Sequence, residues 1–399
     1  MAMEMEMEMA TDRMGEPVYR RAAIMGVGFS TISRSSGRSV LALASEACRN
    51  AIADAGLAPA DVDGVVTYQY LGDSVPAQAV AAALGLGALR HTLDSGLAGQ
   101  APCQLTAHAA TMIGSGAARH VVVYRALNGR SGQRVGRARA DGPAADLRQA
   151  VGLTAYPQTI ALWARRFLVE TGGSEDDLAA VALAQREWAM RNPRALRRTA
   201  LSRADYDRSP YVAAPLRQAD CTLEVDGACA IVLSDLAAAH DGPHPPVFIE
   251  GAAYALGRGG GLDMADLLSW PDLSRNYTSL LATRLFDSAG LRPADVDLAL
   301  LYDCFSSVVL FALEGLGFAE RGGAGALVRS GATRPGGRLP VNPHGGLLNE
   351  GYLHGMNTLA EAVIQLQGRA GDRQVAGARV AAVTSGALQD GSALVLTRH

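Results

Sequence analysis

Tyr302 stands at a position where α/β proteins commonly place their chemistry. The segment Leu300–Phe318 reads LLYDCFSSVVLFALEGLGF. The apolar run Leu298–Leu301 predicts a buried strand, and the two serines after the polar residues can cap a helix over Val308–Leu316. Open α/β sheets bind ligands at the carboxyl ends of their strands. Tyr302 is therefore a candidate catalytic residue for proton transfer, and a partner is expected elsewhere in the chain.

Three other polar or glycine-rich turns follow expected strands in the same way. The first is DSGLAGQAP at Asp94–Pro102, before a helix expected from Cys103. The second is NPHGGLLNEGYLHGMN at Asn342–Asn357, and the third is SGALQDG at Ser385–Gly391. The second turn carries two histidines, which either line a pocket or only satisfy backbone groups of the loop. These turns are the next candidates for functional residues.

The composition predicts a compact protein of two similar parts. The chain has 399 residues, of which 49% are hydrophobic and 19% charged, so one small core is too little for it. The net charge of −3 gives no indication of a nucleic-acid or anionic membrane partner. Five scattered cysteines without a CxxC pair favour reduced thiols in a cytoplasmic protein and argue against a zinc site.

The chain contains no apolar run long enough to span a bilayer, so we expect no membrane span. Its start, MAMEMEMEMA, has neither the basic nor the apolar region of a signal peptide. We interpret residues 1–16 as a disordered N-terminal tail.

A repeated segment indicates an internal duplication. Residues 55–63 read AGLAPADVD and residues 289–297 read AGLRPADVD, with eight of nine positions identical and corresponding positions 234 residues apart. Each copy follows an expected helix and precedes an apolar strand, which is typical of two similar α/β halves. We expect the halves to cover residues 17–240 and 246–399, with a Pro- and Gly-rich junction between them. An insertion at about 127–215 is expected to form a loop or lid over a binding site.

The four turns, in this order on a duplicated α/β pattern, resemble the thiolase superfamily, and most closely its sterol-carrier-protein-type thiolases and lipid-transfer relatives. YDCFSSVVLFALEGLGF, NPHGGLLNEGYLHG and SGALQDGSALVL are similar to three signature segments of that family. The resemblance covers residues 17–399. It implies an α/β thiolase fold, a five-layered αβαβα sandwich built from two duplicated halves.

Departures from the family pattern change the chemistry that the resemblance implies. The position of the family's nucleophilic cysteine corresponds to Gly99, and Cys103 lies four residues later. The activating histidine position holds Tyr352, and the polar residue that opens the HDCF-type segment is replaced by Tyr302. A second cysteine position falls near Ser385. Acyl transfer through a protein thioester is therefore not expected.

The pair of tyrosines resembles the steroid side-chain-cleaving aldolases, a branch that lacks the catalytic cysteines. The resemblance implies retro-aldol cleavage of a β-hydroxyacyl-CoA with a bulky acyl group, giving a ketone and a short acyl-CoA such as propionyl-CoA. Tyr302 and Tyr352 would do the acid and base work, either as phenolates favoured by nearby helix N-termini or through a hydrogen-bond relay. Residues expected to bind substrate are Gly96, Gly99, Gln100, Asp303, His344, Gly345, Gly346 and His354.

The same resemblance implies a homodimer core and a small OB-fold partner with a zinc ribbon, in an α2β2 assembly. No metal is expected on this chain, and no cofactor beyond the coenzyme A carried by the substrate. Two alternatives stay open at this point. The first is a thiolase or acyltransferase that uses Cys103, and the second is a lipid-transfer or scaffold subunit without catalysis.

Overall fold

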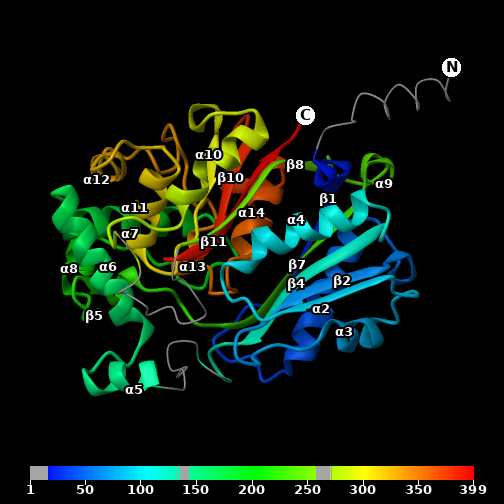
Figure 1. Cartoon of the computed structure of the whole chain (residues 1–399), viewed down its shortest axis with the longest axis horizontal. Coiled ribbons are helices and arrows are strands. Elements are labelled where there is room, and N and C mark those ends of the chain that lie inside the picture. Colours follow the sequence, from blue (N-terminus) through cyan, green and yellow to red (C-terminus); the bar gives the residue numbers. More distant parts are fainter. Residues whose placement is uncertain (1–16, 133, 135–142, 258–269, 271) are drawn as a thin grey trace.

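A computed structural model describes residues 17–132, 134, 143–257, 270 and 272–399 (Figure 1). The tail proposed at residues 1–16 lies outside them. The first part of the chain contains β1 (Ala22–Phe29), α2 (Val40–Asp54), β2 (Gly64–Tyr68), α3 (Ala77–Leu84), β3 (His91–Ser95), α4 (Ala101–Gly114), β4 (His120–Asn128), β7 (Asp226–Asp235) and α9 (Leu236–His240). None of the described helices has the length and apolar content needed to cross a bilayer.

Between β4 and β7 the chain forms a mostly helical insertion. Its elements are α5 (Pro143–Ala150), α6 (Tyr156–Thr171), α7 (Glu175–Ala189), α8 (Arg203–Arg208), β5 (Tyr211–Ala213) and β6 (Leu216–Arg217). Ser174 is the N-cap of α7 and forms a capping box, since its side chain accepts from the Asp176 backbone N–H while the Asp177 side chain accepts from the Ser174 backbone N–H.

The second part repeats the strand–helix alternation. It contains β8 (Val247–Leu256), α10 (Thr278–Ala289), β9 (Leu298–Leu300), α11 (Ser306–Gly315), α12 (Ala324–Arg329), α13 (Gly346–Asn349), α14 (Met356–Leu366), β10 (Val380–Ser385) and β11 (Asp390–Thr397). All strands except β5 and β6 belong to one sheet in the order β3-β2-β4-β7-β1-β8-β11-β10-β9. The two halves join where β1 pairs with β8 over two residue pairs, Ala23 with Phe248 and Ile24 with Val247.

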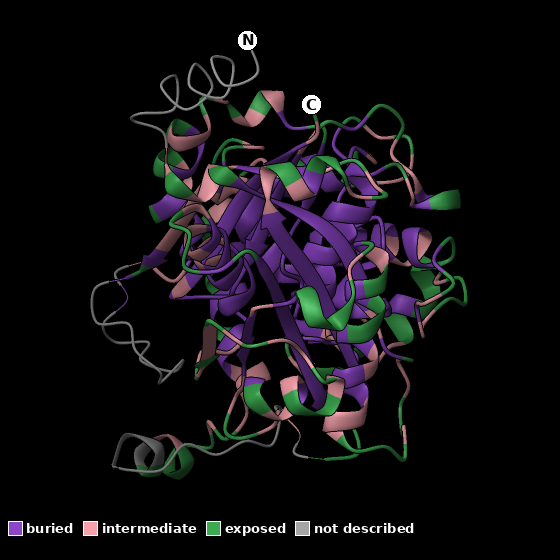
Figure 2. Ribbon diagram, turned by 90° about the vertical axis from the view of Figure 1, so that its right-hand side faces the viewer, coloured by how far each residue is buried: buried purple, intermediate pink, exposed green. Residues whose placement is uncertain are grey.

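Helices cover both outer faces of the strands and fill the space between the halves. Helix α2 packs on β1, β4 and β7, whereas α10 packs on β8 and β11. Helix α4 contacts strands of both halves, and α14 contacts β7 and β10. The strands are buried among these helices (Figure 2). This arrangement confirms the predicted five-layered αβαβα sandwich.

The repeated segments have the same local structure in both halves. Each follows a helix that ends at a left-handed glycine, Gly56 or Gly290, and forms a short 3-10 turn. The last aspartate of each copy then accepts two backbone N–H bonds from the start of a neighbouring strand. Asp63 bonds Arg119 and His120 of the β4 region, and Asp297 bonds Arg379 and Val380 of the β10 region. The repeated aspartate therefore fixes the register between adjacent strands in each half.

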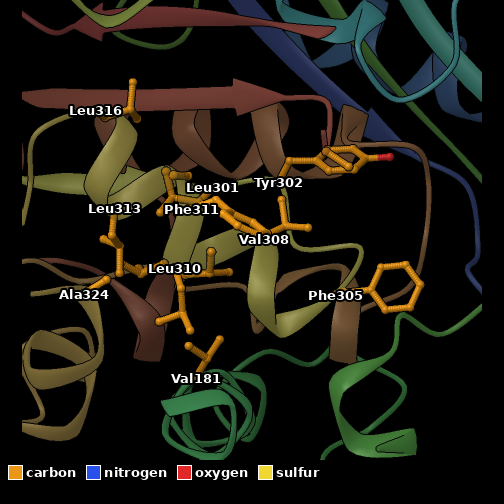
Figure 3. Packing of buried hydrophobic residues seen from close by; sticks show 14 of the residues in the cluster. Val181, Leu301, Tyr302, Phe305, Val308, Leu310, Phe311, Leu313, Leu316 and Ala324 are labelled. Atoms are coloured by element: carbon orange, nitrogen blue, oxygen red, sulfur yellow. The ribbon is translucent and has the colours of Figure 1, made fainter. Parts of the chain in front are cut away.

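Helix α11 holds the candidate catalytic segment against the core. Its apolar side chains pack against α6, α7, α10 and α12, so α11 is buried on all sides. Figure 3 shows Tyr302 at the margin of this cluster, with its hydroxyl pointing away from the packed side chains of Leu310 and Leu313. The cluster thus holds the backbone and the ring of Tyr302 in place, and the hydroxyl group points out of the cluster toward another element.

Candidate active site

Tyr302 and Tyr352 meet in the interior through their hydroxyl groups. The two oxygens are 2.7 Å apart, although the residues are 50 positions apart in the chain. Tyr302 follows β9, and its backbone N–H donates to the Thr384 hydroxyl at 2.9 Å. The Tyr352 N–H donates to the Leu223 carbonyl at 2.9 Å. Both phenols are therefore held by backbone contacts to neighbouring segments, which gives their hydroxyl pair a defined geometry.

A pocket opens onto this pair at the start of the two central helices. Gln100 is the N-cap of α4, and Gly355 is the N-cap of α14. Partial positive charge at helix N-termini stabilises anions, so the pocket is suited to an oxyanion. Its lining residues are Tyr70, Ala98, Gly99, Gln100, Tyr156, Tyr302, Cys304, Tyr352, His354, Gly386, Ala387, Leu388, Gln389 and Asp390.

Gly99 leaves the space that the Tyr302 hydroxyl occupies. A Cβ atom built on Gly99 would lie 1.9 Å from the Tyr302 hydroxyl oxygen and 2.5 Å from its Cζ. Such distances are far below van der Waals contact. Gly355 also lies close to the ring, and a Cβ built on it would be 2.9 Å from two ring carbons. In this arrangement of Tyr302, only glycine fits at position 99, because any other residue would place a Cβ atom against the phenol.

Burial keeps both phenols neutral. Loss of hydration raises the pKa of Tyr302 and of Tyr352 well above that of a free phenol, and the neighbouring tyrosine and Cys304 add to this for Tyr302. The expectation that helix N-termini would favour phenolates at these positions is therefore wrong, because burial raises the pKa of both phenols. The alternative, a relay through a short hydrogen bond, matches the 2.7 Å contact.

Comparisons with known proteins identify the family of this chain. The family model "Thiolase C-terminal domain-like" matches residues 259–398. The "17-hydroxy-3-oxo-4-pregnene-20-carboxyl-CoA lyase" of Mycobacterium tuberculosis is 40% identical over 388 residues, which are 94% of this chain and 99% of that protein. The chain belongs to the thiolase superfamily.

Within the superfamily, the match is to its carbon–carbon lyases. The "Steroid side-chain-cleaving aldolase" of Thermomonospora curvata is 39% identical over 364 residues, covering 87% of this chain and 90% of that one. A solved "Ltp2-ChsH2(DUF35) aldolase" superposes with a TM-score of 0.88 at 38% identity, covering 95% and 98% of the two chains. Human mitochondrial 3-ketoacyl-CoA thiolase shares the fold, with a TM-score of 0.69 at 15% identity. This chain is an enzyme of the aldolase branch.

Cys103, the other nucleophile that the sequence left open, is unsuited to thiolase chemistry. Its side chain is fully buried on α4 and receives a hydrogen bond from the Ser385 hydroxyl at 3.1 Å. Burial raises the pKa of its thiol to about 12. A neutral thiol is a weak nucleophile, and Cys103 is not among the residues that line the pocket. The structure therefore argues against acyl transfer through Cys103.

Several residues that were expected to bind substrate do not line the pocket. Asp303 accepts backbone N–H bonds from Leu347 at 2.8 Å and Leu348 at 3.2 Å, so its carboxyl orders the start of α13. His344 is fully buried, and its carbonyl accepts a bond from Asn192 at 2.8 Å. The residues of the predicted set that are absent from the pocket lining are Gly96, Asp303, His344, Gly345 and Gly346. Gly99, Gln100 and His354 do line it.

Asp390 is a pocket residue that the sequence reasoning missed. The turn was expected to extend to Gly391, whereas β11 begins at Asp390 and places this carboxyl beside Gln100 and Tyr254. Burial raises the pKa of Asp390 to about 6, partly offset by hydrogen bonds from Gln100 and Tyr254. The sequence signal was a carboxylate in an otherwise uncharged SGALQDG turn. Perturbed carboxyls in pockets are typical of functional sites.

We expect Asp390→Asn to stabilise the protein in a pH-dependent way. The folded-state pKa is raised, so ionised Asp390 opposes folding, and this cost grows as pH rises from about 4 to about 6 and is constant above. The substitution should raise the unfolding free energy by about 1–3 kcal/mol at pH 8. Urea unfolding at pH 4.5, 6 and 8 measures this. An equal gain at all three pH values would contradict the assignment.

A wider cleft leads outward from the pocket. The two share Tyr156, Cys304 and Tyr352, so Tyr352 stands where the cleft meets the pocket. The cleft has a volume of about 510 Å³ and runs between the insertion and the second half. Its cationic lining residues are Arg34, Arg130, Arg134 and Arg197. Arg134 forms an ion pair with Glu224. The cleft thus combines apolar walls with positive charge.

Proposed function

We propose that this enzyme cleaves a carbon–carbon bond of a β-hydroxyacyl-CoA thioester by a retro-aldol reaction. The observation that carries the proposal is the hydrogen bond between the Tyr302 and Tyr352 hydroxyls, in a pocket at two helix N-termini where the family's nucleophilic position is Gly99. The reaction needs proton transfer and stabilisation of an enolate, and it needs no covalent intermediate.

The tyrosine pair would act as a neutral proton relay. One phenol accepts the proton of the β-hydroxyl and passes its own proton to the other. In the same concerted event the bond between the α- and β-carbons breaks and its electron pair moves into the thioester enolate. The second phenol gives its own proton to the α-carbon as it accepts one from the first. One proton has moved from oxygen to carbon, and neither tyrosine gains charge. This suits phenols whose pKa values are raised by burial.

The acyl group is proposed from the relatives. The name of the Mycobacterium tuberculosis relative describes a steroid with a hydroxyl at C17 and a CoA thioester on C20, which is the β-hydroxyacyl relation that a retro-aldol step requires. We propose a substrate of this class, with a steroid ketone and propionyl-CoA as products. The arginines of the outer cleft would face the phosphates of coenzyme A. No cofactor beyond this coenzyme A is proposed.

We also propose that the enzyme works as an assembly. One solved relative is an "Ltp2-ChsH2(DUF35) aldolase", a name that pairs two proteins. For this chain we propose a homodimer core with a small OB-fold partner that carries a zinc ribbon, in an α2β2 complex. Co-expression with candidate OB-fold proteins, followed by measurement of the mass of the complex, tests the assembly.

The test of function is an assay of the purified enzyme, alone and with its partner. A 17-hydroxy steroid 20-carboxyl-CoA should yield stoichiometric steroid ketone and propionyl-CoA, separated by liquid chromatography and identified by mass. The 17-deoxy analogue is the matched control, since it has no hydroxyl proton to remove. Binding of the hydroxylated substrate without release of a short acyl-CoA would instead favour a carrier or scaffold role.

A further inference from the structure

His354 lies in the wall of the pocket, yet one of its ring nitrogens forms no hydrogen bond with any residue that the structure describes. The residue is fully buried and lines the pocket together with Tyr302 and Tyr352. Its Nε2 atom makes no hydrogen bond within the described residues. An unpartnered buried polar atom costs free energy, so it calls for an explanation, such as a ligand that is absent from the structure.

The partner of the other ring nitrogen fixes the tautomer of His354. Arg125 approaches Nδ1 with its Nη2 at 3.0 Å and its Nε at 3.3 Å. A guanidinium can only donate, so Nδ1 must accept and the ring proton must be on Nε2. Arg125 is itself fully buried, forms an ion pair with Asp73, and donates to the Tyr68 and Ala126 carbonyls. The arrangement holds a donor at Nε2.

The imidazole ring of His354 is neutral. Burial and the nearby Arg125 charge lower the pKa of His354 well below that of a free imidazole. A neutral imidazole donates a hydrogen bond through Nε2 without giving up its proton. It can therefore stabilise a developing negative charge while the tyrosines carry the proton that moves.

The backbone around His354 is held in an uncommon conformation. His354 has a φ of 50°, in the left-handed region that favours glycine, and Gly355 follows at 84°. This costs free energy at a residue with a side chain, and such strain is typical of functional sites. The Tyr68 hydroxyl donates to the His354 carbonyl at 3.0 Å, and the His354 ring lies edge-on to Tyr352 with centroids 4.6 Å apart. The strained backbone therefore sets the ring against the tyrosine pair.

We propose that His354 donates its Nε2–H to the thioester oxygen on which negative charge develops when the carbon–carbon bond breaks. His354 is then a catalytic residue, and Arg125 and Asp73 are positioning residues that act through it. This inference rests on the proposed retro-aldol function, because that reaction is the source of the enolate oxygen. It adds a side-chain donor to the two helix N-termini at the pocket.

Binding of two unreactive probes tests the donor without any turnover. The first is a dethia-CoA carboxylate, which places a charged oxygen where the enolate oxygen would form, and the second is S-propyl-CoA, which has no oxygen there. In His354→Leu, calorimetry should show the carboxylate bound about 10–100-fold more weakly. S-propyl-CoA should bind nearly as in the wild type. His354→Gln, which keeps an amide donor, should recover part of the carboxylate affinity.

Turnover of the holo assembly supplies the second measurement. His354→Leu should lower kcat by about 10²-fold, with KM changed much less. His120→Leu is the matched control, a buried histidine on β4 whose ring bonds Ser234 of the neighbouring strand β7 and which does not line the pocket. Equal loss of affinity for both probes, or wild-type kcat in His354→Leu, would overturn the proposal. Failure of the wild type to cleave the steroid substrate would overturn the proposed function instead, and the probe comparison would still report on the donor.

Discussion

Tyr302→Phe and Tyr352→Phe should each lower kcat by about 10²–10⁴-fold, because either change removes one of the two oxygens through which the proton passes. The double variant should be no more than about tenfold slower than the slower single one, since a relay broken at one point is already broken. Release of propionyl-CoA under single-turnover conditions measures all three. Additive losses would indicate two independent roles and contradict the relay.

A matched control separates loss of chemistry from loss of structure. Tyr206 is another fully buried tyrosine, and its hydroxyl bonds Asp220 in the insertion, away from the pocket. Tyr206→Phe should leave kcat close to that of the wild type. Circular dichroism and thermal unfolding should show that the Tyr302 and Tyr352 variants keep the fold. Near-normal turnover in both of these variants would refute the active-site assignment.

Gly99→Ala should disable the enzyme although it adds only one methyl group. The new Cβ would overlap the Tyr302 hydroxyl at 1.9 Å and the ring at 2.5 Å, so the phenol has to move and the bond to Tyr352 is lost. Displacements of this size can lower kcat by about 10²-fold. Overpacking should also lower the unfolding free energy by about 1–3 kcal/mol. Steady-state kinetics and urea unfolding measure the two effects.

Gly96→Ala is the control for this prediction. Gly96 lies in the same turn, and a Cβ there meets no atom within 4 Å. Its substitution should change kcat and stability far less than Gly99→Ala. A crystal structure of Gly99→Ala with the tyrosine hydroxyls still 2.7 Å apart would contradict the steric argument. Comparable kinetic effects at both glycines would point to backbone flexibility of the turn as the cause.

The fold could be predicted from the sequence because its signals are local and repeated. The segments ending at Asp63 and Asp297 make the same backbone hydrogen bonds in both halves, so their similarity in sequence has a direct structural cause. Tyr302 was found at the end of an expected strand. Tyr352 was found through the resemblance to the thiolase superfamily, because it stands at the position of the family's activating histidine. Their contact spans segments 50 residues apart and depends on the packing of both halves.

The protonation state of the tyrosines, the role of Asp390 and the conformation of His354 could not be predicted from the sequence. They depend on burial and on exact backbone geometry, which only the folded protein shows. Phenolates were expected near helix N-termini, but the degree of burial that raises the pKa of Tyr352 appears only in the folded protein. Asp390 was missed because its strand begins two residues earlier than the apolar pattern indicates. The left-handed backbone of His354 could not be predicted, because residues other than glycine rarely adopt that conformation.

The overlap between position 99 and the Tyr302 hydroxyl has an evolutionary consequence. A cysteine nucleophile at position 99 and the Tyr302 phenol compete for the same volume, so one pocket cannot hold both sets of machinery. A lineage passing between thiolase and aldolase chemistry by single substitutions must first lose one set before it can gain the other. The two changes are thus subject to reciprocal sign epistasis, and the passage requires a catalytically silent ancestor or a duplicated gene released from selection.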